Sequence, residues 1–276
     1  MSSVSQVPAK LIAELRARTG AGMMDCKKAL EETGGDLDKA VDWLRQKGQA
    51  KGDKRSGRET REGAVAAHIT GDGKAAGIVE LNSETDFVAR NAEFQALVKD
   101  LAREVAERGD VRSADRVKEL AGKTGEHLAV RRSARLELGG AGLIERYVHF
   151  NGQVGVLIEI GSPAGAAPGP ELRALAKDIT LHIASTKPIA VTVADVPPDV
   201  VERERRIYEA QVADQGKPEA IRKKIVEGML RKFYEERVLL EQPFVKDDKV
   251  KIRDLLKQGG GDVTVRRFVC YEVGGA

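Results

Sequence analysis

Ala96-Leu97-Val98-Lys99-Asp100 recurs 78 residues later as Ala174-Leu175-Ala176-Lys177-Asp178. The same shift places Gly77-Ile78-Val79 on Gly155-Val156-Leu157. In each copy an alternating apolar run comes before a run with helical periodicity, which predicts a β-hairpin followed by an α-helix. Two agreements in the same register favour an internal duplication over chance. The sequence therefore predicts an α+β fold whose core consists of two similar halves with antiparallel sheets.

Both predicted hairpins turn at glycine-containing segments. The first runs from Ala64 to Asn82 and turns at Gly71-Asp72-Gly73. The second runs from Leu143 to Gly161 and turns near Asn151-Gly152. Asparagine or aspartate next to glycine is the usual composition of a tight hairpin turn. We therefore expect two antiparallel hairpins, one in each half of the core.

The segment between hairpin and helix differs between the two copies. Thr85-Asp86-Phe87-Val88-Ala89-Arg90-Asn91 precedes the first helix, which is expected near residues 91–108. A spacer of small residues and prolines, Ser162 to Pro170, precedes the second helix, which is expected near residues 170–186. Because the fold tolerates a bare spacer at this point, the phenylalanine and the acid of the first copy are not needed for folding. We expect the function to lie in that first loop.

Composition and charge narrow the class of protein. The 276 residues suffice for two or three domains, and 41% hydrophobic with only 4% aromatic residues predicts aliphatic cores. Lysine plus arginine exceeds aspartate plus glutamate only by 46 to 43, so direct nucleic-acid binding is not expected. Two distant cysteines, Cys26 and Cys270, suit a reducing compartment. Residues 1–8 do not resemble a signal peptide, and no run approaches the roughly 20 apolar residues of a membrane span. We expect a soluble cytoplasmic protein without membrane contact.

The first part of the chain, from residue 8 to residue 48, is expected to form three short helices. Apolar residues recur there at helical spacing: Leu11, Ile12, Leu15, Met23, Cys26, Ala29, Leu30, Leu37, Ala40, Val41 and Leu44. Gly20-Ala21-Gly22 and Gly34-Gly35 separate the helices, Asp36 is the expected N-cap of the third, and Gly48 follows its last turn. The unit is small and can fold only marginally on its own.

Shifts in composition suggest where the domains begin and end. The charged segment after the first unit is almost free of apolar residues, which is typical of a linker. Further helices are expected near Ser113 to Ala121 and near Lys249 to Gln258, and a last strand, Val263 to Val273, is expected to close the second sheet. The expected divisions are residues 1–48 for the first domain, 49–62 for the linker, 63–140 for the first core repeat, 141–196 with 245–276 for the second, and 197–244 for a helical hairpin.

That helical hairpin is predicted from two charged helices joined at Gly216-Lys217-Pro218, where glycine ends one helix and proline starts the next. Each arm carries a narrow apolar stripe, formed by Val200, Ile207, Ile221, Ile225 and Met229. The stripe is too narrow for a buried helix, so an antiparallel hairpin that projects from the body is expected. Its remaining apolar edge is available to another chain.

No arrangement of residues predicts covalent chemistry. Gly122-Lys123-Thr124 resembles the end of a phosphate-binding loop, but Val117 stands where that motif requires glycine and no strand precedes it. Gly20 and Gly22 follow a helix instead of a strand, so a helix break is favoured over a dinucleotide fingerprint. Metal-ligand spacing is missing among the four histidines, which are His68, His127, His149 and His182. We expect a protein that is not an enzyme and that binds no cofactor or metal.

Met23 and Met24 open the second predicted helix and allow two interpretations. Because they are adjacent, both cannot face the same small core. Either one is buried and the other is simply exposed, or the flexible and polarizable pair forms a docking patch flanked by Arg16 and Lys27.

Thr85-Asp86-Phe87 also allows two interpretations. In one, Thr85 or Asp86 caps a short helical turn while Phe87 packs inward. In the other, Phe87 meets a partner and wedges between two helices, where its burial contributes about 1.5–3 kcal/mol. The second copy makes the same connection without phenylalanine or acid, which favours the partner.

Two motifs resemble a known family. The segments Thr19-Gly20-Ala21-Gly22-Met23-Met24-Asp25-Cys26-Lys27-Lys28-Ala29-Leu30 and Thr85-Asp86-Phe87-Val88-Ala89 resemble bacterial translation elongation factor Ts, the nucleotide-exchange factor of elongation factor Tu. Further agreement extends over nearly the whole chain, at His182-Ile183-Ala184-Ser185-Thr186-Lys187-Pro188, Gly216-Lys217-Pro218, Val226-Glu227-Gly228 and Gln242-Pro243-Phe244-Val245. The resemblance implies a three-helix domain similar to ubiquitin-associated (UBA) domains, a duplicated α+β core and a coiled-coil hairpin used in dimerisation.

The resemblance also implies a mechanism. Asp86 and Phe87, within the segment Thr85 to Val88, would enter the GTPase domain of elongation factor Tu, dislodge its Mg²⁺ and promote GDP release. Other positions match contacts of the family with elongation factor Tu: Arg16, Met23, Met24 and Lys27 of the first domain, Thr124 and Gly125, and His149 of the core.

The chain departs from the family pattern in two places. The chain stops soon after Val273, so the additional C-terminal helix of some members is expected to be missing, and docking is expected to rest more on the first domain. Thr124 stands where some members carry a larger apolar residue.

A rival function is that of a dimeric scaffold or RNA-associated protein that uses the helical hairpin and the basic segment Lys51-Gly52-Asp53-Lys54-Arg55.

Overall fold

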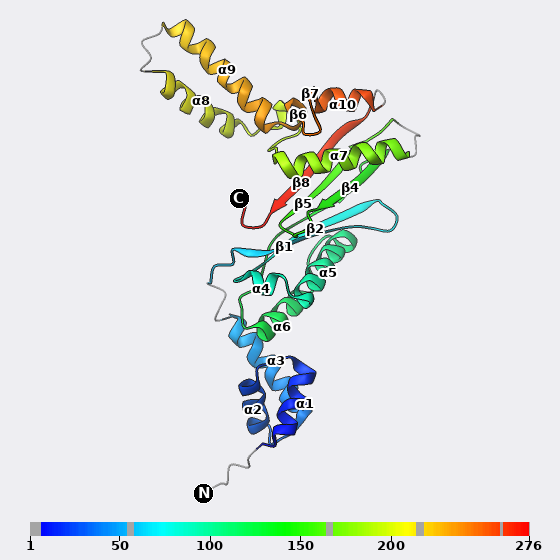
Figure 1. Cartoon of the computed structure of the whole chain (residues 1–276), viewed down its shortest axis with the longest axis vertical. Coiled ribbons are helices and arrows are strands. Elements are labelled where there is room, and N and C mark those ends of the chain that lie inside the picture. Colours follow the sequence, from blue (N-terminus) through cyan, green and yellow to red (C-terminus); the bar gives the residue numbers. More distant parts are fainter. Residues whose placement is uncertain (1–6, 54–57, 164–167, 214–217, 260–261, 276) are drawn as a thin grey trace.

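The structure is a computed structural model that describes residues 7–53, 58–163, 168–213, 218–259 and 262–275. Several sequence predictions fall partly on other residues, among them the first domain 1–48, the linker 49–62, the spacer Ser162 to Pro170, the basic segment Lys51 to Arg55 and the turn Gly216-Lys217-Pro218. Those parts lie outside the described residues. The molecule is elongated, with a helical unit at one end, two sheets and their helices in the middle, and a helical hairpin at the other end (Figure 1).

Three helices form the N-terminal unit: α1 (Ala9–Thr19), α2 (Met23–Glu32) and α3 (Leu37–Asp53). Their apolar faces meet in a small core of Leu15, Cys26, Ala29, Leu30 and Ala40. Asp36 caps α3 as predicted, because its carboxylate accepts hydrogen bonds from the backbone N–H groups of Asp38 and Lys39 at 3.1 and 3.0 Å.

Helix α3 is longer than predicted. It continues to Asp53, so the prediction that Gly48 follows its last turn is wrong, and the expected linker begins inside the helix. A glycine inside a helix costs only about 1 kcal/mol relative to alanine, and the residues that follow, Gln49-Ala50-Lys51, favour helix. The extended α3 packs against α6 (Ala114–Thr124), which joins the N-terminal unit to the rest of the molecule.

The first sheet is antiparallel with the strand order β1-β2-β3: β1 (Glu62–Ile69), β2 (Ala75–Ser83) and β3 (Ala129–Glu137). The predicted hairpin is confirmed in β1 and β2. No strand was predicted for β3, because most of its side chains are half-exposed and its apolar alternation is weak. Helix α5 (Ala92–Arg108) covers one face of the sheet, and the short α4 (Asp86–Ala89) stands between β2 and α5.

The second sheet has the corresponding order β4-β5-β8: β4 (Gly142–Val148), β5 (Val154–Gly161) and β8 (Thr264–Glu272). The prediction that the last strand closes the sheet of the second hairpin is confirmed. Helix α7 (Pro170–Thr186) covers this sheet, and α10 (Ile252–Gln258) adds to the same apolar core. The expected helix from Lys249 starts later than predicted, because residues up to Lys251 belong to a strand.

The faces of the two sheets that their helices do not cover pack against each other. Val65 and Ile78 of the first sheet join Ile144, Leu157 and Tyr271 of the second in one buried cluster. The contact is close, since a Cβ added at Gly155 would lie 2.4 Å from Cγ1 of Val65. The two sheets therefore hold each other in place and form one central body (Figure 1).

The hairpins correspond at a shift of 79 residues, although the predicted shift was 78. Gly63 pairs with Asn82 in the first hairpin, and Gly142 pairs with Gly161 at the same place in the second. Helices α5 and α7, in contrast, keep the shift of 78 residues. The loop between strand and helix is therefore one residue longer in the first half than in the second.

This one-residue difference overturns the predicted match of Gly77 with Gly155. Neighbouring residues of a strand face opposite sides of the sheet. Gly77 faces α5, where an added Cβ would lie 2.4 Å from the backbone N of Ala106, whereas Gly155 faces Val65 of the other sheet. The two glycines permit close approach on opposite faces and are not equivalent.

The helical hairpin consists of α8 (Pro198–Ala213) and α9 (Glu219–Arg237), which pack through Val212, Val226 and Leu230. Ile207 and Ile221 of the predicted stripe remain 43% and 48% exposed. The hairpin joins the body near three short elements: the 3₁₀ turns η1 (Val193–Asp195) and η2 (Leu239–Glu241), and a two-stranded sheet of β6 (Pro243–Phe244) and β7 (Asp247–Lys251). The fold class is thus mixed α+β, as predicted, with N-terminal helices, three small antiparallel sheets and a helical hairpin. In the part of the chain that the structure describes, every helix is too short or too polar to span a bilayer.

Candidate functional site

The loop Thr85 to Asn91 forms two consecutive helix starts. Thr85 caps α4, since its Oγ1 accepts a hydrogen bond from the backbone N of Val88 at 3.4 Å. Asn91 caps α5 in the same way through the backbone N of Glu93 at 2.8 Å. The sequence prediction of a capped helical turn is therefore confirmed.

Phe87 points away from the protein. Its side chain is 83% exposed, while Ala89 is buried and Val88 packs against the core of the first sheet. A one-turn helix has few inward positions, and these two small residues occupy them. The interpretation in which Phe87 packs inward is wrong. Asp86 lies beside it and forms an exposed ion pair with Arg90 at 3.1 Å.

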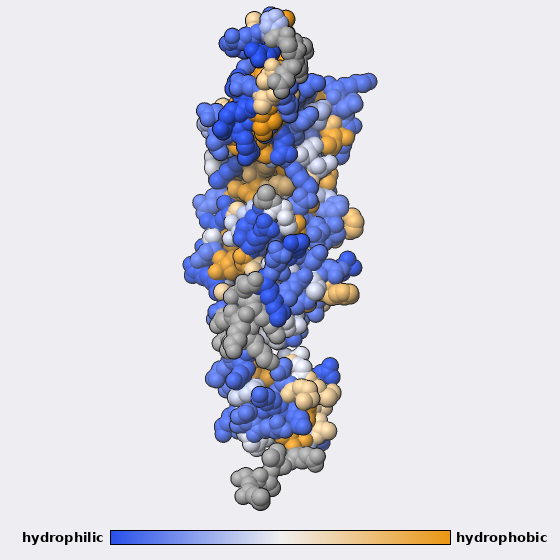
Figure 2. Space-filling model, turned by 90° about the vertical axis from the view of Figure 1, so that its left-hand side faces the viewer, coloured by the Kyte–Doolittle hydropathy of each residue, from blue (hydrophilic) through white to orange (hydrophobic). Residues whose placement is uncertain are grey.

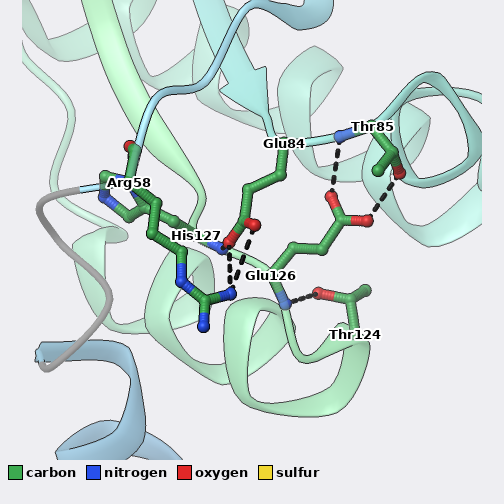
Figure 3. A network of polar contacts seen from close by, with 6 residues as sticks. All are labelled: Arg58, Glu84, Thr85, Thr124, Glu126 and His127. Carbon is green, nitrogen blue, oxygen red and sulfur yellow. Dashed lines mark hydrogen bonds and ion pairs between the residues drawn. The ribbon is translucent and has the colours of Figure 1, made fainter.

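The start of α4 is held by a polar network from the α6–β3 connection (Figure 3). Glu126 accepts hydrogen bonds from the backbone N and from Oγ1 of Thr85, at 3.0 and 2.5 Å. Glu84 accepts a hydrogen bond from the backbone N of His127 at 2.6 Å and pairs with Arg58 at 3.2 Å. The two segments are thus linked in both directions, since Glu126 binds Thr85 and Glu84 binds His127. The loop that carries Phe87 is therefore fixed to the segment behind it.

Thr124 and Gly125, two of the predicted contact residues, adjoin this network. Gly125 ends α6 in the left-handed conformation at φ 78°, and Oγ1 of Thr124 donates to the carbonyl of Leu120 at 2.9 Å. The same Oγ1 accepts from the backbone N of Glu126 at 3.5 Å. Through Glu126, the structure therefore brings Thr124 and the Thr85 loop together (Figure 3), and Gly125 lies between Thr124 and Glu126 in the chain.

The N-terminal unit presents a separate apolar surface. Met23 and Met24 are 59% and 74% exposed, so the interpretation in which one of them is buried is wrong. Met23 borders a shallow groove of about 450 Å³ along α1, which is lined by Ala9, Ile12, Ala13, Arg16 and Ala17. Exposed apolar side chains also gather on one side of this unit in the space-filling view (Figure 2). Lys27 lies on α2 and faces Glu31 at 3.8 Å.

His149 belongs to the turn between β4 and β5, on the second sheet. Its Nδ1 lies 2.7 Å from the hydroxyl of Tyr147, and its ring centroid lies 4.5 Å from that of Phe150. Phe150 is 93% exposed, more than any other large apolar residue that the structure describes. Sequence reasoning missed Phe150. The available signal was a phenylalanine next to Asn151-Gly152, in a turn where polar residues are usual.

The predicted contact residues therefore lie on three parts of the molecule: the groove of the N-terminal unit, the α4 loop with the end of α6, and the β4–β5 turn. Among the described residues, no cluster of three or more His, Cys, Asp or Glu side chains has the geometry to hold a metal ion. Two exposed phenylalanines and an exposed methionine pair are features of protein recognition. Fold and site together define a protein that acts by binding another protein.

Comparison with known proteins identifies the class more closely. The family described as elongation factor TS matches residues 84–275, and the family described as elongation factor Ts, mitochondrial, N-terminal matches residues 1–54. Elongation factor Ts of Symbiobacterium thermophilum is 46% identical over 98% of this chain and 93% of its own length. Those of Nitratidesulfovibrio vulgaris and Aquifex aeolicus are 43% and 40% identical, over 97% and 96% of this chain and 96% and 97% of their own lengths.

The chain belongs to the elongation factor Ts family. Its members are nucleotide-exchange factors for elongation factor Tu in translation elongation, and they carry out no covalent catalysis. The expected partner is therefore elongation factor Tu, and the exchange factor is favoured over the scaffold or RNA-associated rival.

Proposed function

We propose that this chain releases GDP from elongation factor Tu by inserting the tip of α4 into the GTPase domain. Asp86 and Phe87, within the segment Thr85 to Val88, displace the helices that support the Mg²⁺ site of the partner. Loss of Mg²⁺ leaves the phosphate charges of GDP uncompensated, so the nucleotide dissociates. The single observation that carries this proposal is the 83% exposure of Phe87 on a helical turn that is capped and braced from behind.

The interaction energies of the inserted side chain are large enough to explain a fast release of GDP. A thousandfold acceleration of GDP release requires about 4 kcal/mol, at roughly 1.4 kcal/mol for each factor of ten. Burial of one phenylalanine contributes about 1.5–3 kcal/mol, and loss of a metal contact contributes the remainder. Coupling between two ligands of one protein is reciprocal, so a nucleotide that rebinds to elongation factor Tu expels the exchange factor. The cycle therefore remains reversible.

Docking uses the other two surfaces. The groove along α1, with Arg16, Met23, Met24 and Lys27, accepts a helix of the GTPase domain, because a flexible methionine pair adapts to an apolar helix face. His149 contacts a second part of elongation factor Tu, and the adjacent Phe150 adds a fully exposed ring to that contact. Thr124 and Gly125 extend the surface beside α4.

The architecture of the family supports the same assignment of functions to the parts of the molecule. The N-terminal unit corresponds to a UBA-like docking domain, and the two sheets with α5 and α7 correspond to a duplicated core. The hairpin α8–α9 keeps Ile207 and Ile221 exposed, which supports its use in a homodimer. Light scattering of the full chain and of Ile207→Glu tests the dimer: loss of the dimer in the variant is expected, and a monomeric wild-type chain contradicts it.

Removal of Mg²⁺ tests the mechanism. Release of a fluorescent GDP analogue from elongation factor Tu is followed with and without the chain, first with Mg²⁺ and then with excess EDTA. Since the chain is proposed to act by displacing the metal, its acceleration is expected to shrink strongly in EDTA. Phe87→Ala should show a small acceleration in both conditions, and Val245→Ala, which removes another exposed apolar side chain, should behave like the wild type. An equal acceleration in both conditions contradicts metal displacement.

A further inference from the structure

Helix α4 has only four residues, Asp86–Ala89. A helix of one turn is not stable by itself, because nucleation fixes several residues for a single hydrogen bond. Packing of Val88 and Ala89 against the core turns Phe87 outward, and the groups that hold the ends of α4 fix the orientation of the turn itself. At the C-terminal end, Nε2 of Gln95 donates to the carbonyl of Ala89 at 2.7 Å. At the N-terminal end, the holding group is the carboxylate of Glu126.

Glu126 binds Thr85 with both carboxylate oxygens. One oxygen accepts from the backbone N of Thr85, and the other accepts from its hydroxyl. A threonine hydroxyl has one hydrogen, and here that hydrogen is directed at Glu126. The lone pairs of the hydroxyl are then free to accept from the backbone N of Val88, which is the capping bond of α4. Glu126 thus orients the cap as well as the backbone that precedes it.

Glu126 itself is fixed by its neighbours. Its backbone N is hydrogen-bonded to Thr124, and the next residue, His127, is bound by Glu84 from the strand end that leads into Thr85 (Figure 3). Nδ1 of His127 lies 3.0 Å from the carbonyl of Arg58, whose side chain pairs with Glu84. The carboxylate of Glu126 is therefore a fixed support and not a mobile surface group.

We infer that Glu126 is a positioning residue for nucleotide exchange: it acts through Thr85 to hold α4, and hence Phe87, in the orientation that enters the partner. This inference rests on the proposed insertion of Phe87. A support of this kind acts on the step after docking, so its loss lowers the maximal rate of GDP release and leaves the concentration of half-saturation unchanged.

A matched control exists elsewhere in the chain. Asp195 accepts hydrogen bonds from the backbone N and Oγ1 of Thr192, at 2.9 and 2.7 Å, and Thr192 caps the one-turn helix η1. As with Thr85, the donors are a backbone N–H and a hydroxyl, although both bond to one oxygen, Oδ2, of Asp195. The turn η1 lies beside the helical hairpin, since Val196 at its end shares a buried cluster with Val200 and Val201 of α8. Asp195→Ala removes an equivalent support away from the proposed contacts.

The test measures GDP release from elongation factor Tu over a range of concentrations of the full chain, for Glu126→Ala, Glu126→Gln, Asp195→Ala and Phe87→Ala. Glu126→Ala should lower the maximal rate about tenfold, the effect of one charge-assisted hydrogen bond, with half-saturation unchanged. Glu126→Gln keeps one acceptor oxygen, so its maximal rate should lie between those of Glu126→Ala and the wild type. Asp195→Ala should keep the wild-type rate.

Two further measurements separate positioning from a general loss of structure. In Phe87→Ala, the additional change Glu126→Ala should have no further effect, because the group that it positions is gone. Amide hydrogen exchange at Val88 should accelerate in Glu126→Ala and not in Asp195→Ala.

The outcomes distinguish this inference from the proposed function. A wild-type rate for Phe87→Ala contradicts the insertion itself. A slow Phe87→Ala together with a wild-type rate for Glu126→Ala contradicts only the positioning role. That role is also contradicted if Glu126→Ala slows release equally with and without Phe87, or if it changes half-saturation alone.

Discussion

Phe87 on α4 and Phe150 in the β4–β5 turn are the two most exposed large apolar side chains among the described residues of the central body, and they are supported in different ways. Phe87 stands on a capped helical turn that is braced by Glu126. Phe150 stands on a hairpin turn and has the ring of His149 as its neighbour. The Phe150 turn is held as well, since the carbonyl of Gly152 accepts a hydrogen bond from the backbone N of Val65 at 2.7 Å. The two rings differ in their immediate surroundings: Phe87 projects from a single helical turn, whereas Phe150 lies against a second ring and offers a broader surface to a partner. Exposure alone would give both residues the same role, and these surroundings separate a working tip from an anchor.

The largest expected effect is on the tip. Phe87→Ala should lower the maximal rate of GDP release between tenfold and a hundredfold, because the burial energy of about 1.5–3 kcal/mol is lost at the step in which α4 enters the partner. Stopped-flow release of a fluorescent GDP analogue at saturating factor measures this rate. The distinction between tip and anchor fails if the variant reaches the wild-type plateau.

A smaller effect is expected on the anchor. Phe150→Ala should raise the concentration of factor at half-saturation by about tenfold, with the plateau rate unchanged, since peripheral aromatic contacts contribute affinity of about 1–2 kcal/mol. The same concentration series, or calorimetry with nucleotide-free elongation factor Tu, measures it. If the plateau falls and half-saturation does not move, Phe150 belongs to the tip and the comparison breaks.

The smallest expected effect concerns the sheets behind the two rings, which are built alike. Each central strand carries a buried glutamate, Glu80 or Glu159, at a β-bulge and paired with two neighbouring arginines of the third strand. Desolvation raises the pKa of Glu159, but the backbone N of Gly139 and the two arginines outweigh it, so that its pKa lies below the ordinary 4.5. A lowered pKa stabilises the folded chain above the unfolded-state value, and that contribution is lost as the pH falls through the folded-state value.

We therefore expect the free energy of unfolding to decrease below about pH 4.5, and the difference between wild type and Glu159→Gln to narrow there. Urea unfolding at neutral pH and near pH 3.5 measures both chains. A difference that stays constant over this range would show that ionisation of Glu159 does not contribute. The effects of Phe87→Ala and Phe150→Ala on GDP release should be unchanged in the Glu159→Gln background at neutral pH, because they arise from the two exposed rings and not from the sheets.

Much of the fold could be predicted from the sequence. Hairpin turns at Gly71-Asp72-Gly73 and Asn151-Gly152, closure by the last strand, and the helical hairpin all follow from periodicity and turn residues. Strand β3 did not, because its exposed charged residues mask the alternation on which strand prediction depends. The one-residue error in the hairpin shift arose because a Gly-apolar-apolar match carries no information about which face each residue occupies.

The site was predictable to a similar extent. The position of the tip followed from the asymmetry of the two loops, and its chemistry followed from the resemblance. Whether Phe87 faces in or out depends on the packing of Val88 and Ala89, and the support by Glu126 depends on a contact across 41 residues. Neither leaves a periodic signal in the sequence. Phe150 was missed because its one signal, an aromatic residue beside the turn residues Asn151-Gly152, is not periodic.

The most direct measurement is one stopped-flow series of GDP release from elongation factor Tu, over increasing concentrations of wild type, Phe87→Ala and Phe150→Ala. The account predicts a lower plateau with unchanged half-saturation for Phe87→Ala, and an unchanged plateau with weaker half-saturation for Phe150→Ala. If both variants change the same parameter to the same extent, the assignment of Phe87 as the working tip is contradicted.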